Sequence, residues 1–385
     1  MFEWIIIGGG IHGCTVATYL VKKKKVPIEK ICVIDPYPEP LHKWKRVTGF
    51  IAMPFLRSPF VHHLDINPFS LQSFKKDDGE HFFGPYKRPA LSLFNQHSFA
   101  VLEEIEMHKA WYQGMVNQVE KGVEDWVVKT SSSDRFHGKN LVIATGMNHQ
   151  LSYPSWGEEL TSVRPKQAGH LFEESLPHME PPFVVIGGGI SAAHLVIKLS
   201  NEFPGQVYQV ARHPYRVHDF DSDPGWLGPK HMSSFERISH YDERRDVITE
   251  ARHKGSMPRE LANKLRNLIR HDACTFTEDE IESWDVAGDD IILQLTKQKS
   301  GIKAKTILFA TGFSKEVMKV DWLQNLIQQE NLTCAKCGFP IVNEDLSWCN
   351  HLFVTGPLAE LEIGPVSRNI SGARKAAERI VNHAI

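Results

Sequence analysis

Two short runs of consecutive apolar residues, most of them β-branched, stand out along the chain at 5–7 and 183–186. Runs of this kind are typical of parallel strands that are buried on both faces of a sheet. Each run is followed by a glycine-rich turn, then by apolar residues at helical spacing, and then by a further segment that is expected to form a strand, at 31–34 and 206–211. The pattern therefore predicts two strand–helix–strand units in a chain of the α/β class.

The first glycine turn has the spacing GxGxxG, with Gly8, Gly10 and Gly13 at the glycine positions. In such a turn the first glycine allows a tight bend, the second lets a pyrophosphate approach the backbone, and the third lets helix and strand pack closely. The helix that follows presents its first amides to the phosphates. Asp35 ends the next strand, where a carboxylate accepts hydrogen bonds from a ribose 2′-hydroxyl. This context favours a dinucleotide site over an ordinary glycine turn, and we expect FAD there.

The second glycine turn, at 187–192, has the spacing GxGxxA. The strand that follows its helix ends in Arg212 and His213 instead of a carboxylate. An acidic residue at this place would repel a 2′-phosphate, whereas a guanidinium binds one through two hydrogen bonds. We therefore predict NADPH at this turn; the alternative is that Arg212 is an ordinary solvated side chain.

The remaining elements suggest two Rossmann-like dinucleotide-binding domains, of which the FAD domain is discontinuous. Apolar runs at 140–143 and 306–309 each lead into an Ala-Thr-Gly sequence, at 144–146 and 310–312. An amphipathic helix is expected over 258–269, within a stretch rich in charged and aromatic residues. The predicted division is an FAD domain at 1–164, an NADPH domain at 165–314 with an insertion at 214–285, and a second part of the FAD domain at 315–385.

The composition is that of a folded protein and gives no sign of a nucleic-acid or membrane partner. Of the 385 residues, 42% are hydrophobic and 10% aromatic, and 44 Lys and Arg nearly balance 46 Asp and Glu. No apolar stretch approaches the roughly 20 residues of a membrane span, and the chain begins directly in a strand without a secretory signal. Six scattered cysteines suit a reducing compartment, so we predict a cytoplasmic location. A homo-oligomer is left open.

These motifs together resemble the two-dinucleotide-binding flavoprotein superfamily. Within it, the chain is most similar to class B flavin monooxygenases, especially their lysine/ornithine N-hydroxylase-like branch. Besides the glycine turns, three segments carry this resemblance. Residues 53–57 and 64–71 resemble the branch's flavin-flanking region, Gly169-His170 precedes the second turn, and 310–313 resembles an Ala-Thr-Gly-aromatic linker between domains. The resemblance covers almost the whole chain as architecture.

The resemblance implies an NADPH-dependent FAD monooxygenase that uses O2 and a small-molecule substrate. In that reaction NADPH reduces the flavin, O2 forms a C4a-hydroperoxyflavin, and a nucleophilic nitrogen or sulfur attacks its distal oxygen. Two alternatives remain: an NADPH-dependent flavoprotein reductase that passes electrons to a disulfide or other acceptor without oxygenation, and a redox sensor without catalytic activity. The C-terminal segment 355–361 lacks the Gly-Asp dipeptide with which disulfide reductases contact the flavin ribityl chain. Glu360, Glu362 or backbone groups are expected to replace it.

Arg57 and the pair His62-His63 are expected close to the flavin ring. Arg57 would stabilise the anionic reduced flavin, and His62 and His63 would line the ring or a substrate channel, with hydrogen-bonded loop histidines as the alternative. Trp44 would either stack on the flavin or fill the core. No catalytic acid–base pair is expected, because the chemistry needs mainly a dry site. The expected cofactor contacts are Gly8, Gly10, Ile11, His12, Gly13, Asp35, Pro36, Trp44, Arg57, Ala144, Thr145, Gly146, Gly187, Gly189, Ile190, Ser191, Arg212, His213, Thr311, Gly312, Gly356 and Pro357.

A group of cysteines near the C-terminus offers a possible metal or redox site. Cys334 and Cys337 form a CxxC, and Cys349 and His351 follow. Such residues can form a tetrahedral zinc site or a redox dithiol. The irregular spacing and the strand-and-turn residues at 338–343 favour a surface hairpin instead, so no metal is predicted.

Overall fold

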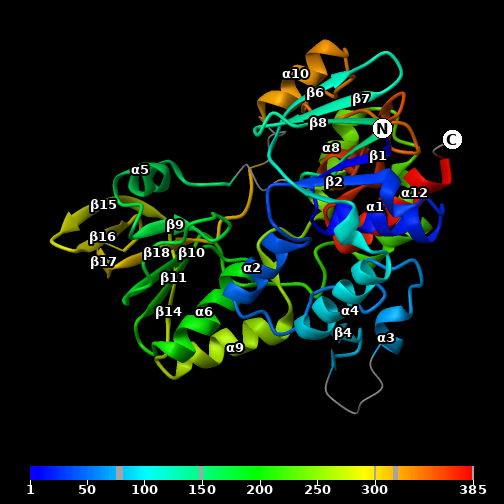
Figure 1. Cartoon of the computed structure of the whole chain (residues 1–385). Coiled ribbons are helices and arrows are strands. Elements are labelled where there is room, and N and C mark those ends of the chain that lie inside the picture. Colours follow the sequence, from blue (N-terminus) through cyan, green and yellow to red (C-terminus); the bar gives the residue numbers. More distant parts are fainter. Residues whose placement is uncertain (75–80, 147–150, 299–300, 315–319, 384–385) are drawn as a thin grey trace.

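The computed structural model describes residues 1–74, 81–146, 151–298, 301–314 and 320–383, which form two α/β lobes (Figure 1). Each lobe is built around a largely parallel sheet, as the paired strand–helix–strand units predict. The two largely parallel sheets with their helices confirm the α/β fold class. None of the helices in these ranges is long and apolar enough to cross a membrane.

The first lobe contains residues from both ends of the chain. Its sheet has the strand order β19 (Ser347–Cys349), β20 (Leu352–Val354), β8 (Arg135–Ile143), β1 (Phe2–Ile7), β2 (Ile31–Asp35) and β5 (Trp111–Gln113). All neighbours are parallel except β19 and β20, and the hairpin of β6 (Val116–Lys121) and β7 (Trp126–Thr130) pairs with β8. Because β20 pairs with β8, the lobe is discontinuous, as predicted. The predicted return point at 315 lies outside the described residues.

Helices cover the sheet of the first lobe, which explains its apolar strands. In β1, Ile5 and Ile6 are fully buried and Ile7 is 3% exposed, as expected of a strand with packing on both faces. The helices that pack around this sheet are α1 (Ile11–Lys22), α4 (Leu91–Glu104), α10 (Asp321–Gln329) and α12 (Ile370–His383), with α12 beside α1. The start of α12 thereby comes close to the first glycine turn.

The second lobe has five parallel strands with a different layer on each face. Their order is β14 (Thr275–Glu278), β11 (Val207–Ala211), β10 (Phe183–Ile186), β18 (Thr306–Phe309) and β9 (Ala168–His170). In β10, Phe183 and Val185 pack with α6 (Ile190–Glu202) and α9 (Arg259–Arg270). Val184 packs on the other face, against α5 (Ser155–Val163) and the sheet of β15 (Ile281–Ala287), β16 (Asp290–Leu295) and β17 (Gly301–Ala304). Alternate side chains of β10 therefore pack against the two different layers.

The expected insertion at 214–285 divides between the two lobes. Its first part contains α7 (Pro229–Phe235) and α8 (Tyr241–Ala251), and Trp226, Phe235 and Ile248 are buried in the core of the first lobe. Its second part supplies β14 and α9 to the second lobe, and α9 confirms the amphipathic helix predicted over 258–269. Burial of the large aromatic side chains against the first lobe is the physical reason. The chain therefore crosses between the lobes within the expected insertion.

Several further helices and strands of the described residues are short. Helix α2 runs towards the second lobe in Figure 1, and Ile51, just after it, packs in the core of that lobe. These elements are α2 (His42–Phe50), α3 (Ser70–Ser73), β3 (Phe82–Phe83), β4 (Arg88–Pro89), β12 (Arg216–Val217), β13 (Ser256–Met257) and α11 (Glu360–Ile363).

Candidate active site and cofactor sites

The first glycine turn joins β1 to α1 in a conformation that requires glycine. Gly8 has a φ of +107°, and a Cβ on it would lie 2.6 Å from the carbonyl oxygen of Ala144. A Cβ on Gly13 would lie 1.8 Å from the carbonyl oxygen of Gly8, whereas the space beside Gly10 is open. No described side chain caps the first turn of α1, which leaves its amides available to an anion. The turn has both the room and the donors for a pyrophosphate.

Asp35 ends β2 with its carboxylate directed at the glycine turn. Its Oδ2 accepts a hydrogen bond of 2.6 Å from the amide of Gly9, and its Oδ1 accepts one of 3.0 Å from the amide of Tyr37. Asp35 therefore orders the first glycine turn.

The second glycine turn repeats this geometry between β10 and α6. Gly187 has a φ of +142°, and a Cβ on it would lie 2.6 Å from the carbonyl oxygen of Ala310. Helix α6 begins after Gly189, and no described side chain caps it. Ala192, at the place of the third glycine, is fully buried. The two turns therefore have similar backbone conformations, and each leads into a helix whose first amides are not capped by a described side chain.

Residues from other segments of the same chain border the second turn, as the Trp111 side chain borders the first. A Cβ on Gly188 would lie 3.0 Å from Cε1 of His213, and one on Gly189 would lie 3.6 Å from Cα of Gly255. Arg212 is exposed at the end of β11. His213 thus forms a wall of the turn, while the Arg212 guanidinium is accessible from solvent.

One cavity of about 800 Å³ lies between the lobes and borders both glycine turns. The predicted cofactor contacts that line it are Gly8, Gly10, Ile11, His12, Asp35, Pro36, Trp44, Arg57, Ala144, Thr145, Gly146, Ile190, Ser191 and Pro357. The predicted residues outside its lining are Gly13, His63, Gly187, Gly189, Arg212, His213, Thr311, Gly312 and Gly356. The starts of α1 and α6 therefore face one common space.

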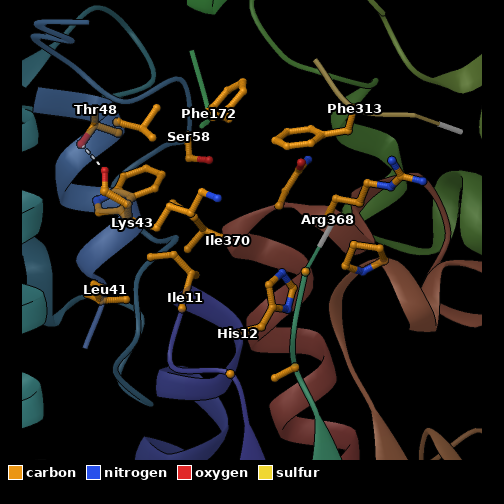
Figure 2. Close-up of a pocket in the computed structure, with 18 of the residues that line it drawn as sticks. Ile11, His12, Leu41, Lys43, Thr48, Ser58, Phe172, Phe313, Arg368 and Ile370 are labelled. Atoms are coloured by element: carbon orange, nitrogen blue, oxygen red, sulfur yellow. Dashed lines mark hydrogen bonds between the residues drawn. The ribbon is translucent and has the colours of Figure 1, made fainter. Parts of the chain in front are cut away.

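The cavity has aromatic and aliphatic walls from both lobes. Phe172 and Phe313 pack together with ring centroids 4.8 Å apart, across the cavity from His12 (Figure 2). Trp44 lines the cavity and also packs on Phe94, with ring centroids 5.5 Å apart. These walls make the space between the two turns largely apolar.

His12 connects the first glycine turn to the C-terminal part of the chain. Its Nδ1 lies 3.0 Å from Oγ1 of Thr355, and its ring lies 3.5 Å from where a Cβ on Gly356 would be. Burial lowers the pKa of His12 to about 4, although a hydrogen bond to the backbone of Arg368 opposes this shift. The imidazole is therefore neutral at neutral pH and serves to position the segments around it.

The two Ala-Thr-Gly segments take equivalent positions in the two lobes. The amides of Ala144 and Ala310 each donate a 2.8 Å hydrogen bond to the last residue of the strand that leads into the glycine turn. The Thr311 hydroxyl donates to the carbonyl oxygen of Ser152. Both segments therefore support a glycine turn from the neighbouring strand.

Arg57 lines the cavity, but its guanidinium is occupied by protein carbonyl groups. Its Nε donates to the carbonyl oxygen of Asp219 at 3.0 Å, and its Nη2 donates to those of His218 and Phe220 at 2.7 Å. The Ser256 hydroxyl is a further partner, at 2.9 Å. Arg57 thereby fastens the loop after α2 to the segment that crosses back to the first lobe.

His63 does not reach the cavity, so the expectation that it lines the flavin ring or a substrate channel is not met. It is fully buried, with its Nε2 3.1 Å from the carbonyl oxygen of Pro68 and its Nδ1 3.1 Å from the amide of Asp65. Burial lowers its pKa to about 3. It is the hydrogen-bonded loop histidine of the alternative interpretation, and its neighbour His62 lines the cavity instead.

Sequence reasoning missed the start of α12 as part of the site. Arg368, Asn369, Ile370 and Ser371 all line the cavity, and Arg368 and Ile370 appear in Figure 2. The available signal was the polar Ser-Arg-Asn sequence just before the last helical stretch, which is typical of a helix start. Arg252, from the segment that crosses between the lobes, was also missed.

Glu360 and Glu362 do not line the cavity, so neither replaces the missing ribityl contact. Glu360 is 1% exposed, and its carboxylate lies 2.6 Å from Arg368, 3.2 Å from Arg245 and 3.6 Å from Arg252. Burial by itself would raise the pKa of Glu360, but the arginines outweigh burial and hold it below its ordinary value. Glu360 is therefore an ionised carboxylate within an arginine cluster.

The C-terminal cysteines lie apart from the cavity. All six cysteines of the chain are free, and none of them lines it. Cys334 forms an isolated bridge with Pro340, and Nδ1 of His351 lies 2.8 Å from Oδ1 of Asn140. Within the described ranges, no three His, Cys, Asp or Glu side chains are grouped to hold a metal.

Comparisons with known proteins agree with this architecture. A curated relative, the uncharacterized oxidoreductase CzcO of Bacillus subtilis (strain 168), is 24% identical over 206 residues, 52% of this chain and about half (53%) of the relative's length. The ornithine N-hydroxylase of Kutzneria sp. 744 has a TM-score of 0.76 and 17% identity, covering 99% of this chain and 98% of that one. The cadaverine monooxygenase DfoA of Erwinia amylovora, solved with FAD, has a TM-score of 0.74 and 16% identity, covering 99% and 94%.

At these identities the structural likeness shows the fold, and it confirms the two-dinucleotide-binding architecture that the resemblance implied. A family model covers far more of the sequence than the curated relative does. It is described as pyridine nucleotide-disulphide oxidoreductase and matches residues 2–378. Since this match spans nearly the whole chain, the protein belongs to the pyridine nucleotide-disulphide oxidoreductase family.

Proposed function

We propose that this chain is an NADPH-dependent FAD monooxygenase that oxygenates a small nucleophilic nitrogen or sulfur compound. The observation that carries the proposal is the single cavity that borders the starts of both α1 and α6. Dinucleotides with their phosphates at these two helix starts would extend into one space. Hydride transfer from a nicotinamide to a flavin requires that proximity.

The first turn fits FAD in its room and in its hydrogen-bonding groups. The open space beside Gly10 and the uncapped amides of α1 suit the pyrophosphate, and Asp35 suits a ribose hydroxyl. When bound, FAD supplies the redox chemistry by accepting a hydride and then, once reduced, reacting with O2. At the second turn, the start of α6 and the exposed Arg212 suit the phosphates of NADPH.

The cavity walls consist mainly of apolar side chains and offer few groups for acid–base catalysis. Burial lowers the pKa of His62 to about 4, as it does for His12, so both imidazoles are neutral at neutral pH. Exclusion of water protects a reactive reduced flavin from wasteful side reactions. The aliphatic and aromatic side chains of the lining include Ile11, Leu41, Val47, Met53, Leu56, Phe172 and Phe313.

The cysteine positions favour oxygenation over dithiol-based disulfide reduction. A dithiol that relays electrons from a flavin must lie beside it, and no cysteine of this chain lines the cavity. Burial also raises the pKa of Cys334, which disfavours the reactive thiolate. The two structures of the same fold described above are an ornithine N-hydroxylase and a cadaverine monooxygenase, which further supports an oxygenating enzyme.

Stopped-flow spectroscopy of the holoenzyme tests the proposal. We expect NADPH to bleach the visible flavin absorbance, and isotopically labelled O2 to deliver one oxygen atom to a member of a panel of amines, thiols and sulfides. Rapid NADPH-dependent reduction of disulfides or quinones without label in any product would show the reductase instead. A purified protein that neither contains nor binds FAD would contradict both enzymes.

Arg212→Ala should weaken the binding of NADPH far more than the binding of NADH. Charge-assisted hydrogen bonds contribute about 1.5–3 kcal/mol each, so we expect the KM for NADPH to rise roughly tenfold or more while that for NADH changes little. Steady-state flavin reduction with each nucleotide measures this, with the exposed Arg259→Ala on α9 as a control that should change neither. Equal changes for both nucleotides would rule out a 2′-phosphate contact.

Arg57→Ala should loosen the backbone around 218–220. Each lost hydrogen bond is worth about 1 kcal/mol, so amide hydrogen exchange there should accelerate roughly tenfold. Arg57→Lys keeps the charge but not the planar fork, so it should restore little protection. A stabilising effect on reduced FAD would instead lower the flavin midpoint potential in Arg57→Ala, and Arg57→Lys would restore it. Unchanged exchange in Arg57→Ala would contradict the positioning role.

A further inference from the structure

The arginine cluster around Glu360 carries more positive than negative charge where it meets the cavity. Arg245, Arg252 and Arg368 converge on the single carboxylate of Glu360. Asp221 is the second carboxylate, 2.9 Å from Nη2 of Arg252, but it also lies 4.0 Å from Nη1 of Arg57. The positive charges of these three arginines are therefore opposed only by Glu360 and by Asp221, and Asp221 is shared with Arg57.

Other carboxylates do not compensate this excess. Asp223 also lines the cavity, but it is exposed, and its Oδ1 accepts from the amide of Gly225 and lies 3.2 Å from His231 and 3.9 Å from Lys230. Glu362 pairs instead with other arginines, Arg244 and Arg379. The local balance thus stays positive.

Several donors of the cluster are buried without an acceptor. Nη1 of Arg252, and Nε and Nη2 of Arg245, make no hydrogen bond to any described residue. Nη1 of Arg252 has only the 3.6 Å ion-pair contact with Glu360. Buried donors without acceptors cost free energy, and an anion that binds beside Nη1 of Arg252 would remove the part of this cost that belongs to the cavity wall.

Two of the three arginines line the cavity. Arg252 and Arg368 do so, whereas Arg245 packs behind them with its guanidinium 3.9 Å from the ring centroid of Phe339. Asn369 and Ser371 add neutral polar groups to the same wall. The pyrophosphate of FAD has its own donors at the first glycine turn, so it does not need this wall.

We propose that Arg252 and Arg368 bind a carboxylate of the substrate, which makes the substrate class a small amine or sulfide that carries an anionic group. This inference rests on the proposed function, because it places the reacting nitrogen or sulfur in the same cavity as the flavin. Arginine suits the role because it keeps its charge and carries five N–H donors. Glu360 accepts from Nε and Nη2 of Arg368, which leaves the Nη1 group of Arg368 for a substrate carboxylate. Glu360 keeps both guanidinium groups in position from behind.

Equilibrium titration of the oxidised holoenzyme tests the subsite without turnover. Methylthioacetate and methylthioacetamide have nearly the same shape and differ in charge, and the flavin spectrum reports binding of either. We expect the carboxylate to bind at least roughly tenfold more tightly than the amide. Equal affinities, or no measurable binding of either compound, would overturn the inference.

Two variants test whether Arg252 forms part of the carboxylate subsite. Arg252→Gln should remove most of the preference for the carboxylate, whereas Arg237→Gln, an exposed arginine of the same segment, should retain it. A full preference in Arg252→Gln would overturn the inference even if the wild type prefers the carboxylate. The wild-type comparison decides the case if a variant fails to fold. Failure of NADPH to reduce the flavin would refute the proposed function and is measured separately from this binding preference.

Discussion

Replacing Gly13 by alanine is expected to abolish FAD binding and to lower the free energy of unfolding by about 3 kcal/mol. The new Cβ would lie 1.8 Å from the carbonyl oxygen of Gly8 and 3.0 Å from its carbonyl carbon. Both are backbone atoms of the turn itself, so no side-chain rotation relieves the overlap and helix α1 must move away from β1. Flavin absorbance of the purified protein and urea denaturation measure the two effects.

Gly49→Ala is the matched control for this prediction. Gly49 lies in α2, and nothing lies within 4 Å of the position of an added Cβ. Alanine in a helix is more stable than glycine by up to about 1 kcal/mol, so this variant should be as stable as the wild type or slightly more stable, with full FAD content. A Gly13→Ala protein with stoichiometric FAD and wild-type stability would contradict the role of the turn.

Glu360→Gln should be the most destabilising single substitution in the arginine cluster. It leaves Arg245, Arg252 and Arg368 close together with no carboxylate between them. Removal of one partner from a buried ion pair typically costs about 3–5 kcal/mol, because the remaining charge stays desolvated. Urea denaturation at neutral pH measures the loss. The exposed Glu250→Gln on α8 should change stability by no more than about 0.5 kcal/mol.

The stability difference between the wild type and Glu360→Gln should depend on pH. The folded-state pKa of Glu360 lies below its ordinary value of 4.5, so its ion pairs stabilise the fold fully above that pH and lose their effect as the pH falls through the folded-state value. The stability gap between wild type and Glu360→Gln should therefore narrow on acidification below 4.5. A gap that stays constant in this range would show that lost packing, not lost charge, destabilises the variant.

The glycine turns also show how local signals and tertiary context combine at one site. Their spacing predicted tight turns at Gly8 and Gly187, and both residues adopt positive φ. His213, expected at this turn from its place at the end of β11, does border it. The same spacing did not predict that Gly255 would border the second turn, because Gly255 approaches it from a segment that returns to the second lobe. The division of the expected insertion between the lobes has the same origin, since the burial of Trp226 depends on a surface of the other lobe.

The sequence by itself determined the two dinucleotide turns, the strands around them, Asp35 and the α/β architecture, because these features depend on local spacing and on which side chains a strand or helix must bury. Only the tertiary structure decided that both helix starts border one cavity, that His62 and not His63 lines it, and that Arg252 and Arg368 meet at Glu360. Residues more than a hundred positions apart meet in this cluster. Their contact depends on how the crossing segment packs on the first lobe, and no local pattern encodes that packing.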